Sequence, residues 1–211
     1  MTTSIRPVAA SVEAIAASAP VPQVPRRRRA RSEAVLIRGA QAGSEADLAA
    51  LFHRHWPRAY RAAFLIVHDH AAAEDIAQEA FLSAIRHLDR FDRRRGFAPW
   101  LGRIVANRAI DWTRARTARR ETTDAGREPM DAGREPMVDE AQPAGVYSPE
   151  VLCALATLAP DHRAVVVLRY VLEFTPGEIA RALELPRGTV NSRLRRGLDT
   201  LEAALREEAY R

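Results

Sequence analysis

The sequence of 211 residues contains no lysine, so all 32 of its basic residues are arginines. Because lysine codons are rich in A, this bias, together with abundant alanine, indicates a GC-rich genome. The bias weakens any argument that arginine was selected over lysine for its planar, forked guanidinium. There is also only one cysteine, Cys153, which excludes an internal disulfide and a cysteine-rich zinc site. Cys153 lies in an apolar run, so we expect a buried structural thiol.

Long apolar runs are missing as well. No stretch approaches the roughly 18 apolar residues that a membrane-spanning helix needs. The alanine-rich N-terminus lacks a basic segment followed by an apolar core, and Arg6 and Glu13 interrupt it, so we expect no signal peptide. Without these signals, and with a single thiol, the sequence fits a cytoplasmic protein.

Basic residues outnumber acidic residues by 32 to 27, which gives a net charge of +5 and a pI of about 10.2. This balance is typical of proteins that bind nucleic acid or an anionic surface. A solvated surface accounts for the charge equally well, so the placement of the arginines along the chain has to decide.

Apolar residues recur at helical spacing over residues 33–120. The pattern continues beyond Pro57, starts again near Ala71, and resumes after a loop that carries arginines at residues 93–95. Pro99 then suits the first turn of a further helix. The apolar positions are Leu48, Leu51, Phe52, His55, Trp56, Ala59, Ala63, Phe64 and Val67, then Ile76, Ala80, Phe81, Ala84, Ile85 and Leu88, then Trp100, Leu101, Ile104 and Val105.

Two other segments lack this periodicity. Residues 1–32 are mainly Ala, Pro, Ser and Val with an arginine run at residues 26–29, and we expect a disordered tail. Residues 121–148 contain the heptapeptide DAGREPM twice in tandem, and the Gly and Pro of each copy are incompatible with a helix. They predict a flexible acidic linker. The fold class expected is therefore all-α, with two small helical domains at residues 33–120 and 149–211.

Residues 175–198 predict a helix-turn-helix. Thr175 and Glu178 have the spacing of a capping box, with Pro176 at the first helical position. Pro186 separates this short helix from a second, strongly basic one. The positions that would pack the two helices together are Ile179, Ala180, Leu183, Leu185, Val190 and Leu194.

The second of these helices would present hydrogen-bonding side chains outward, as a DNA recognition helix must. Arginine can bind guanine, and asparagine adenine, through paired hydrogen bonds in the major groove. The alternative is an ordinary amphipathic hairpin with an arginine-rich solvent face, but the spacing and basicity favour DNA binding. The residues expected to face outward are Arg187, Asn191, Ser192, Arg195 and Arg196.

Aromatic residues and arginines alternate over residues 91–120. This composition suits single-stranded DNA, since phosphates bind arginine and each unstacked base can stack on a ring for about 1–3 kcal/mol. Alternatively the rings belong to the core. We favour a core position for Trp100, whereas Phe97, which follows Gly96 in a loop, is expected to be exposed.

The preceding helix carries Asp75, Gln78 and Glu79 at helical spacing, so they form one polar patch. No His, Lys or Ser stands where it would complete a catalytic set, so we expect no enzyme. The polar patch is therefore either a solvated face or a face that docks on another protein. We expect no metal and no cofactor, because histidines two residues apart point in different directions on a helix, as in the pairs His53 with His55 and His68 with His70.

Three segments resemble the sigma-70 family of bacterial RNA polymerase subunits. They are AEDIAQEAFLSAIRHLDRFD from Ala73, FAPWLGRIVANRAID from Phe97, and the helix-turn-helix. The sequence is most similar to the compact extracytoplasmic-function (ECF) sigma factors, which retain only regions two and four. The resemblance covers residues 46–120 and 149–205. The motifs are specific in this order and spacing, whereas the helix-turn-helix alone would not be.

The resemblance implies that the first domain is region 2-like and docks on the β′ clamp helices of core polymerase through Asp75, Gln78, Glu79 and Phe81. It also implies that residues 91–112 melt the promoter −10 element and read it as a single strand, next to duplex DNA. The residues implied in these contacts are Phe97, Trp100, Arg103, Asn107, Arg108, Arg114 and Arg116.

The resemblance further implies that the second domain is region 4-like, reads the duplex −35 element, and meets the β flap with its other face. Many family members carry a basic residue where Asn191 stands, so the base preference stays open. An anti-sigma factor is a further candidate partner. The residues implied in −35 recognition are Arg187, Thr189, Asn191, Ser192, Arg193, Arg195 and Arg196.

Other functions compete with this interpretation. A stand-alone helix-turn-helix regulator predicts a dimer on a palindromic site, but the first domain shows no dimer zipper or ligand pocket. A recombinase or nuclease needs clustered catalytic groups. A sigma mimic that sequesters an anti-sigma factor could spare its DNA-reading arginines, yet they are present. We therefore predict a sigma factor that directs core polymerase to specific promoters and promotes DNA melting.

Overall fold

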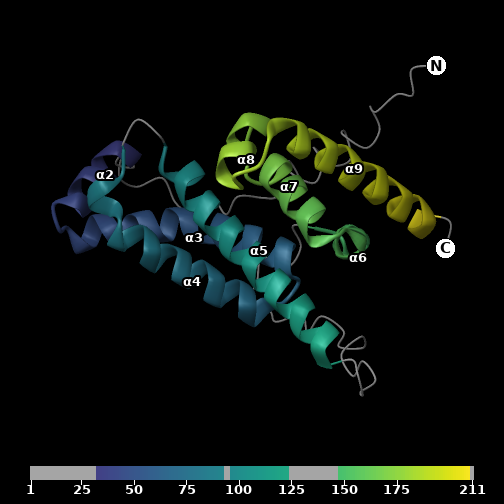
Figure 1. Cartoon of the computed structure of the whole chain (residues 1–211). Coiled ribbons are helices and arrows are strands. Elements are labelled where there is room, and N and C mark those ends of the chain that lie inside the picture. The colour runs from purple at the N-terminus through teal and green to yellow at the C-terminus, as the bar shows by residue number, and fades with distance from the viewer. Residues whose placement is uncertain (1–31, 93–95, 124–146, 210–211) are drawn as a thin grey trace.

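The computed structural model describes residues 32–92, 96–123 and 147–209, and over these ranges it contains helices, turns and short connections but no strand, which confirms the all-α class (Figure 1). The predicted tail at residues 1–31, the arginine loop at residues 93–95 and most of the predicted linker lie outside the described residues. The helices are α2 (Glu33–Gln41), α3 (Glu45–Val67), α4 (His70–Arg86), the 3-10 turn η1 (Leu88–Arg90), α5 (Phe97–Thr123), α6 (Pro149–Thr157), α7 (Pro160–Tyr170), α8 (Pro176–Ala182) and α9 (Arg187–Ala209).

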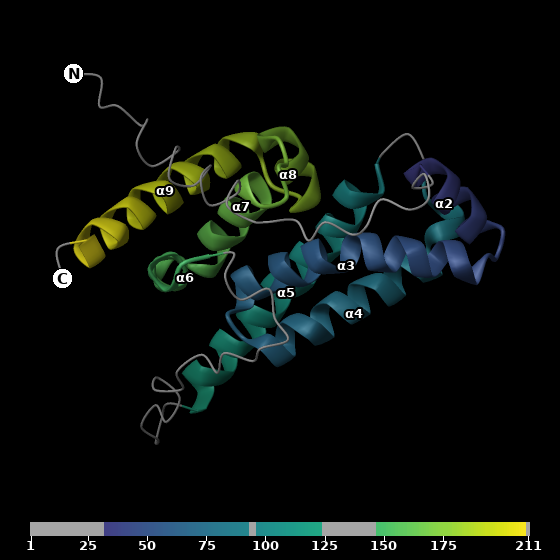
Figure 2. The same cartoon turned by 180° about the vertical axis from the view of Figure 1, so that it is seen from behind.

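Helix α3 is the centre of the first bundle, with α2, α4 and α5 packed around it (Figure 2). It begins after Ser44, whose hydroxyl accepts a hydrogen bond from the Asp47 N–H at 3.3 Å and so caps the start of the helix. The helix passes through Pro57, which lies at an exposed position, so the apolar residues on both sides of the proline belong to one helix. The chain leaves it at His68 in a left-handed conformation, with φ of 53°.

Helix α4 packs closely on α3 because its inner face is made largely of alanines. Asp69 caps the helix by accepting a hydrogen bond from the Ala72 N–H at 3.0 Å. Ile85, predicted to face the core, is instead 39% exposed. The reason is that the core-facing stripe follows Ala84 and Leu88, which turns Ile85 toward solvent. The buried inner face comprises Ala72, Ala73, Ile76, Ala77, Ala80, Phe81 and Ala84.

Helices α6 to α9 form the second bundle. Residues 165–168 of α7 are buried, since α9 covers one side of this helix and α3 and α5 cover the other. The prediction for Cys153 is wrong, because the thiol is exposed. Helix α6 buries Val151, Ala154 and Leu155 instead, and these define a face that Cys153 does not share.

The helix-turn-helix forms as the sequence predicts. In α8 the Thr175 side chain accepts a hydrogen bond from the Glu178 N–H, and the Glu178 carboxylate accepts one from the Thr175 N–H at 2.8 Å. The N–H and the hydroxyl of Thr175 both donate hydrogen bonds to the Glu178 carboxylate, and they lower its pKa. Helix α9 lies against α7 at Gly197, where a Cβ atom would stand 2.9 Å from the Val166 Cγ2 atom. The glycine therefore permits the close approach of α9 to α7.

The two bundles are packed together, and the main polar contact between them is made by Arg163 of α7. Its guanidinium Nη1 donates a hydrogen bond to the Ile66 carbonyl at the end of α3, at 2.8 Å. Its Nη2 donates to the carbonyls of Ala156 and Leu158, at 2.8 and 2.9 Å. Burial lowers the pKa of Arg163 to about 10, so the side chain stays charged at neutral pH.

A close apolar contact supports the same interface. A Cβ atom on Gly102 of α5 would stand 3.0 Å from Leu172 and 3.1 Å from Phe174, both in the segment between α7 and α8. Nearby, the Arg58 guanidinium of α3 pairs with the Glu173 carboxylate at 3.3 Å. Helices α3 and α5 of the first bundle are therefore in direct contact with the second.

Stability should fall on mild acidification because of His68, which lies at this junction. Burial, with a smaller contribution from the Arg163 cation, lowers the pKa of His68 to about 4 from its ordinary 6.5. The unfolded chain therefore binds more protons than the folded chain between pH 6.5 and 4, and stability is lost as the pH falls through that window. Between pH 7.5 and 5 we expect this histidine alone to account for about 2 kcal/mol.

Urea denaturation at the two pH values tests this expectation. The variant His68→Asn has no titrating imidazole, and asparagine tolerates a left-handed backbone, so its free energy of unfolding should change less with pH than that of the wild type. An equal loss of stability in both proteins would show that His68 is not the group responsible.

Candidate nucleic-acid and docking surfaces

The N-terminal half of α9 has one buried and one exposed side. Val190 and Leu194 are buried against the rest of the second bundle. The five side chains predicted to face outward are all exposed, which confirms that part of the prediction. This surface combines cations with amide and hydroxyl groups, the chemistry needed to contact base edges and phosphates. Its exposed residues are Arg187, Asn191, Ser192, Arg195 and Arg196.

The other two residues of the predicted set are half-buried. Thr189 lies in the first turn of α9, and the side chain of Arg193 is 22% exposed. Arg193 Nη2 lies 2.7 Å from the Asp161 carboxylate of α7, and the other oxygen of this carboxylate is 3.2 Å from Arg114 Nη2 of α5. Asp161 therefore holds one candidate DNA contact from each bundle.

A cleft of about 620 Å³ opens beside this carboxylate, between α5, α7 and α9. Arg114 and Thr117 line it from α5, and Ser192 and Arg196 line it from α9. Residues expected to contact the two ends of a DNA site thus face one another across a single basic cleft.

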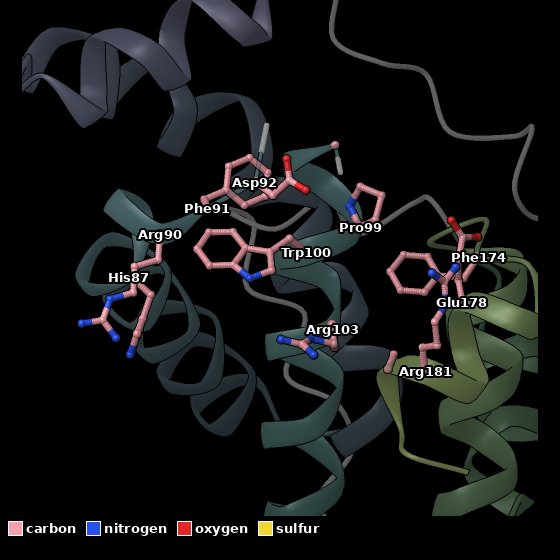
Figure 3. A pocket seen from close by; sticks show the side chains of 12 residues that line it. His87, Arg90, Phe91, Asp92, Pro99, Trp100, Arg103, Phe174, Glu178 and Arg181 are labelled. Carbon is pink, nitrogen blue, oxygen red and sulfur yellow. The ribbon is translucent and has the colours of Figure 1, made fainter. Parts of the chain in front are cut away.

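A larger hollow of about 720 Å³ lies between the start of α5 and α8 (Figure 3). Figure 3 shows Trp100 and Arg103 on α5, with Glu178 and Arg181 on α8 across the hollow. Trp100 is half-buried and Arg103 is exposed. An indole ring can stack a base, and guanidinium groups beside it can neutralise the phosphate of the same nucleotide. The placement of Trp100 is intermediate, since it packs on the core and also lines the hollow.

The predicted exposure of Phe97 is wrong, because its side chain is only 3% exposed. Phe97 is the first residue of α5 and points into the first bundle, where its ring lies 5.0 Å from His55 and 5.9 Å from Phe91. Its N–H donates a hydrogen bond to the Glu33 carboxylate at 3.1 Å. In this arrangement Phe97 supports Trp100, at a ring distance of 5.7 Å, and does not itself reach solvent.

The remaining predicted −10 residues lie along α5. Arg103 and Asn107 are exposed. Arg108 forms an ion pair with Glu79 of α4, and Arg116 pairs with Asp69 at 3.1 Å while lying 5.1 Å from the centre of the Trp112 ring. Several arginines of this helix are thus held by carboxylates of the chain itself.

The outer face of α4 carries the predicted docking patch. Asp75, Gln78 and Glu79 are all exposed there, as the sequence predicts. Leu82, which the sequence analysis did not single out, is 55% exposed one turn further along, and Ile85 is beside it. Helical spacing from Asp75 and Gln78 would have found Leu82. An apolar centre next to acidic groups is typical of a protein-binding surface.

Phe81 does not belong to this exposed face. It is 4% exposed and packs against Phe52 at a ring distance of 4.8 Å, and against Trp56 at 6.0 Å. The expectation that Phe81 takes part in docking is corrected accordingly, because the side chain stabilises the α3–α4 contact from inside. We define the outer α4 face as Asp75, Gln78, Glu79, Leu82 and Ile85.

Comparison with known families gives two matches. The sigma-70 region 2 model matches residues 51–120, and the sigma-70 region 4 model matches residues 148–201. The first match contains the outer α4 face and most of α5, and the second contains the helix-turn-helix.

Characterised relatives agree with these matches. The chain is 30% identical over 178 residues to the ECF RNA polymerase sigma factor SigW of Bacillus subtilis, covering 81% of this chain and 95% of SigW. It is 34% identical over 157 residues to the RNA polymerase sigma factor CarQ of Myxococcus xanthus, covering 74% and 88%. With the ECF RNA polymerase sigma factor SigL of Mycobacterium tuberculosis it shares 31% identity over 172 residues, covering 81% and 96%.

Two solved structures have a similar fold. CnrH, in complex with the cytosolic domain of CnrY, aligns with a TM-score of 0.58 at 26% identity, covering 83% of this chain and 97% of CnrH. The sigma factor RpoE of Bartonella quintana, in complex with the anti-sigma factor NepR, also has a TM-score of 0.58, at 21% identity, with 76% and 97% covered.

Proposed function

The chain belongs to the sigma-70 family, in its extracytoplasmic-function branch, and on this premise we propose which parts of the molecule carry out each step of promoter recognition. As a sigma factor, it binds RNA polymerase and promoter DNA, directs the polymerase to specific promoters, and promotes DNA melting. The observation that carries the assignment of its parts is the separation of the outer α4 face, the Trp100 hollow and the exposed α9 surface.

Residues 33–120 act as the region 2-like domain and residues 149–211 as the region 4-like domain. The family matches at 51–120 and 148–201 support this division. Helix α5 extends to Thr123, so the connection between the domains is slightly shorter than the predicted linker at residues 121–148.

The outer α4 face docks on the β′ clamp helices of core polymerase. Its carboxylates, Asp75 and Glu79, would meet cationic groups of the partner, and Leu82 would bury apolar surface at the centre of the contact. Buried apolar anchors surrounded by polar groups supply most of the affinity in protein interfaces. This assignment replaces Phe81 with Leu82 as the apolar contact.

The Trp100 hollow receives an unpaired base of the −10 element. Trp100 supplies the stacking surface, while Arg103 lies where it can neutralise a phosphate. Asn107 extends the same exposed face of α5. Capture of an unpaired base shifts the equilibrium toward the open duplex by binding free energy alone, so we assign no catalytic residue to the chain.

The exposed surface of α9 reads the −35 element as duplex DNA. Arg187, Asn191 and Ser192 stand in the N-terminal half of the helix, which enters the major groove in helix-turn-helix proteins. Arg195 and Arg196 follow on the same surface and fit phosphate contacts. Two weak readers on one chain gain effective concentration when the polymerase holds both at the promoter spacing.

We propose that the protein works in the cytoplasm, under the control of a protein partner. No helix within the described ranges is long and apolar enough to cross a membrane. The likeness to CnrH, which has been solved in complex with the cytosolic domain of CnrY, supports a protein partner, and an anti-sigma factor is the candidate that we propose.

The docking assignment is tested with the double variant Asp75→Arg, Leu82→Ser. Reversing the charge and removing the apolar anchor should weaken binding to purified core polymerase by at least about tenfold, a loss of roughly 1.4 kcal/mol. Glu207→Arg, an exposed charge reversal near the end of α9, is the matched control and should bind normally. Core affinity of the double variant equal to that of the wild type would rule out this face.

Strand opening should depend on the Trp100 ring. Trp100→Ala removes stacking of about 1–3 kcal/mol, so the lifetime of heparin-resistant promoter complexes should shorten at least fivefold. Trp100→Tyr keeps a stacking surface and should retain most of the lifetime. If the alanine variant opens promoters as well as wild type, the base is held elsewhere.

Arg195 should contribute to the salt dependence of binding to duplex DNA. In the holoenzyme, Arg195→Ala should reduce the slope of log K against log salt for −35 duplex binding by about 0.9, the value for one lost phosphate contact. Arg206→Ala, an exposed arginine further along α9 that pairs with Glu202, should leave the slope unchanged. An unaltered slope in Arg195→Ala would assign this side chain a role other than phosphate binding.

A further inference from the structure

The ion pair between Glu79 of α4 and Arg108 of α5 joins the proposed docking face to the proposed −10 reader. We propose that Glu79 is a positioning residue: in the free protein it restrains Arg108, and docking on core polymerase releases Arg108 toward the promoter strand. This inference rests on the proposed function and adds a coupling between its first two steps.

The exposure of the two partners supports a competition for Glu79. Its side chain is 62% exposed on the outer α4 face, so an incoming cation can reach the carboxylate. The side chain of Arg108 is 33% exposed, and its Nη1 donates to Glu79 Oε2. A guanidinium binds a phosphate with the same N–H donors that it uses for a carboxylate. Arg108 therefore cannot bind both anions fully at once.

The other acid–arginine pairs of α5 do not have this arrangement. Arg114 pairs with Asp161 of α7, and Arg116 pairs with Asp69 at the start of α4. Neither acid belongs to the outer α4 face. Among the described residues, the Glu79–Arg108 pair is the one that places its carboxylate on the docking face and its guanidinium on the DNA-reading helix.

The size of the effect follows from the nature of the pair. An exposed ion pair changes an equilibrium by about two- to fivefold. Restraint of Arg108 should therefore weaken single-strand binding of the free protein by this factor, and docking should restore it. Such a bias disfavours promoter contacts by the free protein without blocking them.

A double-mutant cycle on the full-length protein tests the coupling. The variants are Glu79→Gln, Arg108→Ala and the two combined, and the probe is a short fluorescent single-stranded DNA of mixed sequence. Glu79→Gln should tighten binding by about two- to fivefold and increase the salt slope by about 0.7, as one further phosphate contact requires. In the Arg108→Ala background the same substitution should have no effect, whereas in an Arg108→Lys background it should still tighten binding.

Glu74→Gln is the matched control, because Glu74 lies on the same helix, is exposed, and accepts a hydrogen bond from Gln78. It removes the same charge and should leave single-strand affinity unchanged. With saturating core polymerase, the wild type and Glu79→Gln should bind the strand equally, because docking has already released Arg108.

Two results would overturn the inference. One is an unchanged affinity and salt slope in Glu79→Gln, and the other is equal tightening in the presence and absence of Arg108, which would reflect net charge alone. Failure of the proposed docking itself is distinguishable, because it appears as normal core affinity of the Asp75→Arg, Leu82→Ser variant whatever the outcome of the cycle.

Discussion

The buried guanidinium of Arg163 is the interaction on which the arrangement of the two domains depends. It lies in α7 and donates hydrogen bonds to the carbonyls of Ile66, Ala156 and Leu158, so it joins the end of α3 to the start of the second bundle. Carbonyls at a helix end carry partial negative charge and suit a cation. An interface built on such bonds can separate at lower cost than a purely apolar one. When the domains part, water molecules can take the place of the carbonyls as hydrogen-bond partners of the guanidinium.

Charge pairing organises the rest of the surface in a similar way. Arginine keeps its charge under all relevant conditions, so each guanidinium that is partly removed from water needs an anionic or carbonyl partner. The carboxylates of Glu79, Asp161 and Asp69 supply these partners to arginines of α5. The exposed arginines of α9, Arg187, Arg195 and Arg196, form the surface that we propose reads the −35 element. In our proposal, Arg108 has to be released by docking, whereas these three arginines are ready to bind DNA.

Local features of the molecule could be predicted from the sequence. The capping box of Thr175 and Glu178 and the outward side chains of α9 depend on residues three or four positions apart, and the structure confirms them. Features set by tertiary packing could not be predicted. Phe97 is buried because α3 covers it, and no local signal in the sequence shows that the start of α5 packs against α3. Phe81 stood on the predicted apolar face of its helix, and its ring packs on Phe52 of α3.

The ion pairs of α5 show the same limit. Arg108 and Glu79 are 29 residues apart, and Arg114 and Asp161 are 47 apart, so neither pair has a signature in local spacing. The exposure of Leu82 was not predicted for a different reason. Its helical spacing with Asp75 and Gln78 is visible in the sequence, but an apolar residue in a helix with many apolar residues is expected in the core. Only the packed bundle distinguishes the two faces of α4.

The most direct test of the central claim is transcription by a reconstituted holoenzyme, with purified core polymerase, the full-length chain and fragments of genomic DNA from a bacterium that encodes it. Specific transcripts should start at defined positions only when both polymerase and the chain are present, and the starts should lie downstream of shared −35 and −10 sequences. Transcription that is the same with and without the chain, or sequence-specific DNA binding by the chain that needs no polymerase, would contradict the assignment of promoter recognition to this protein.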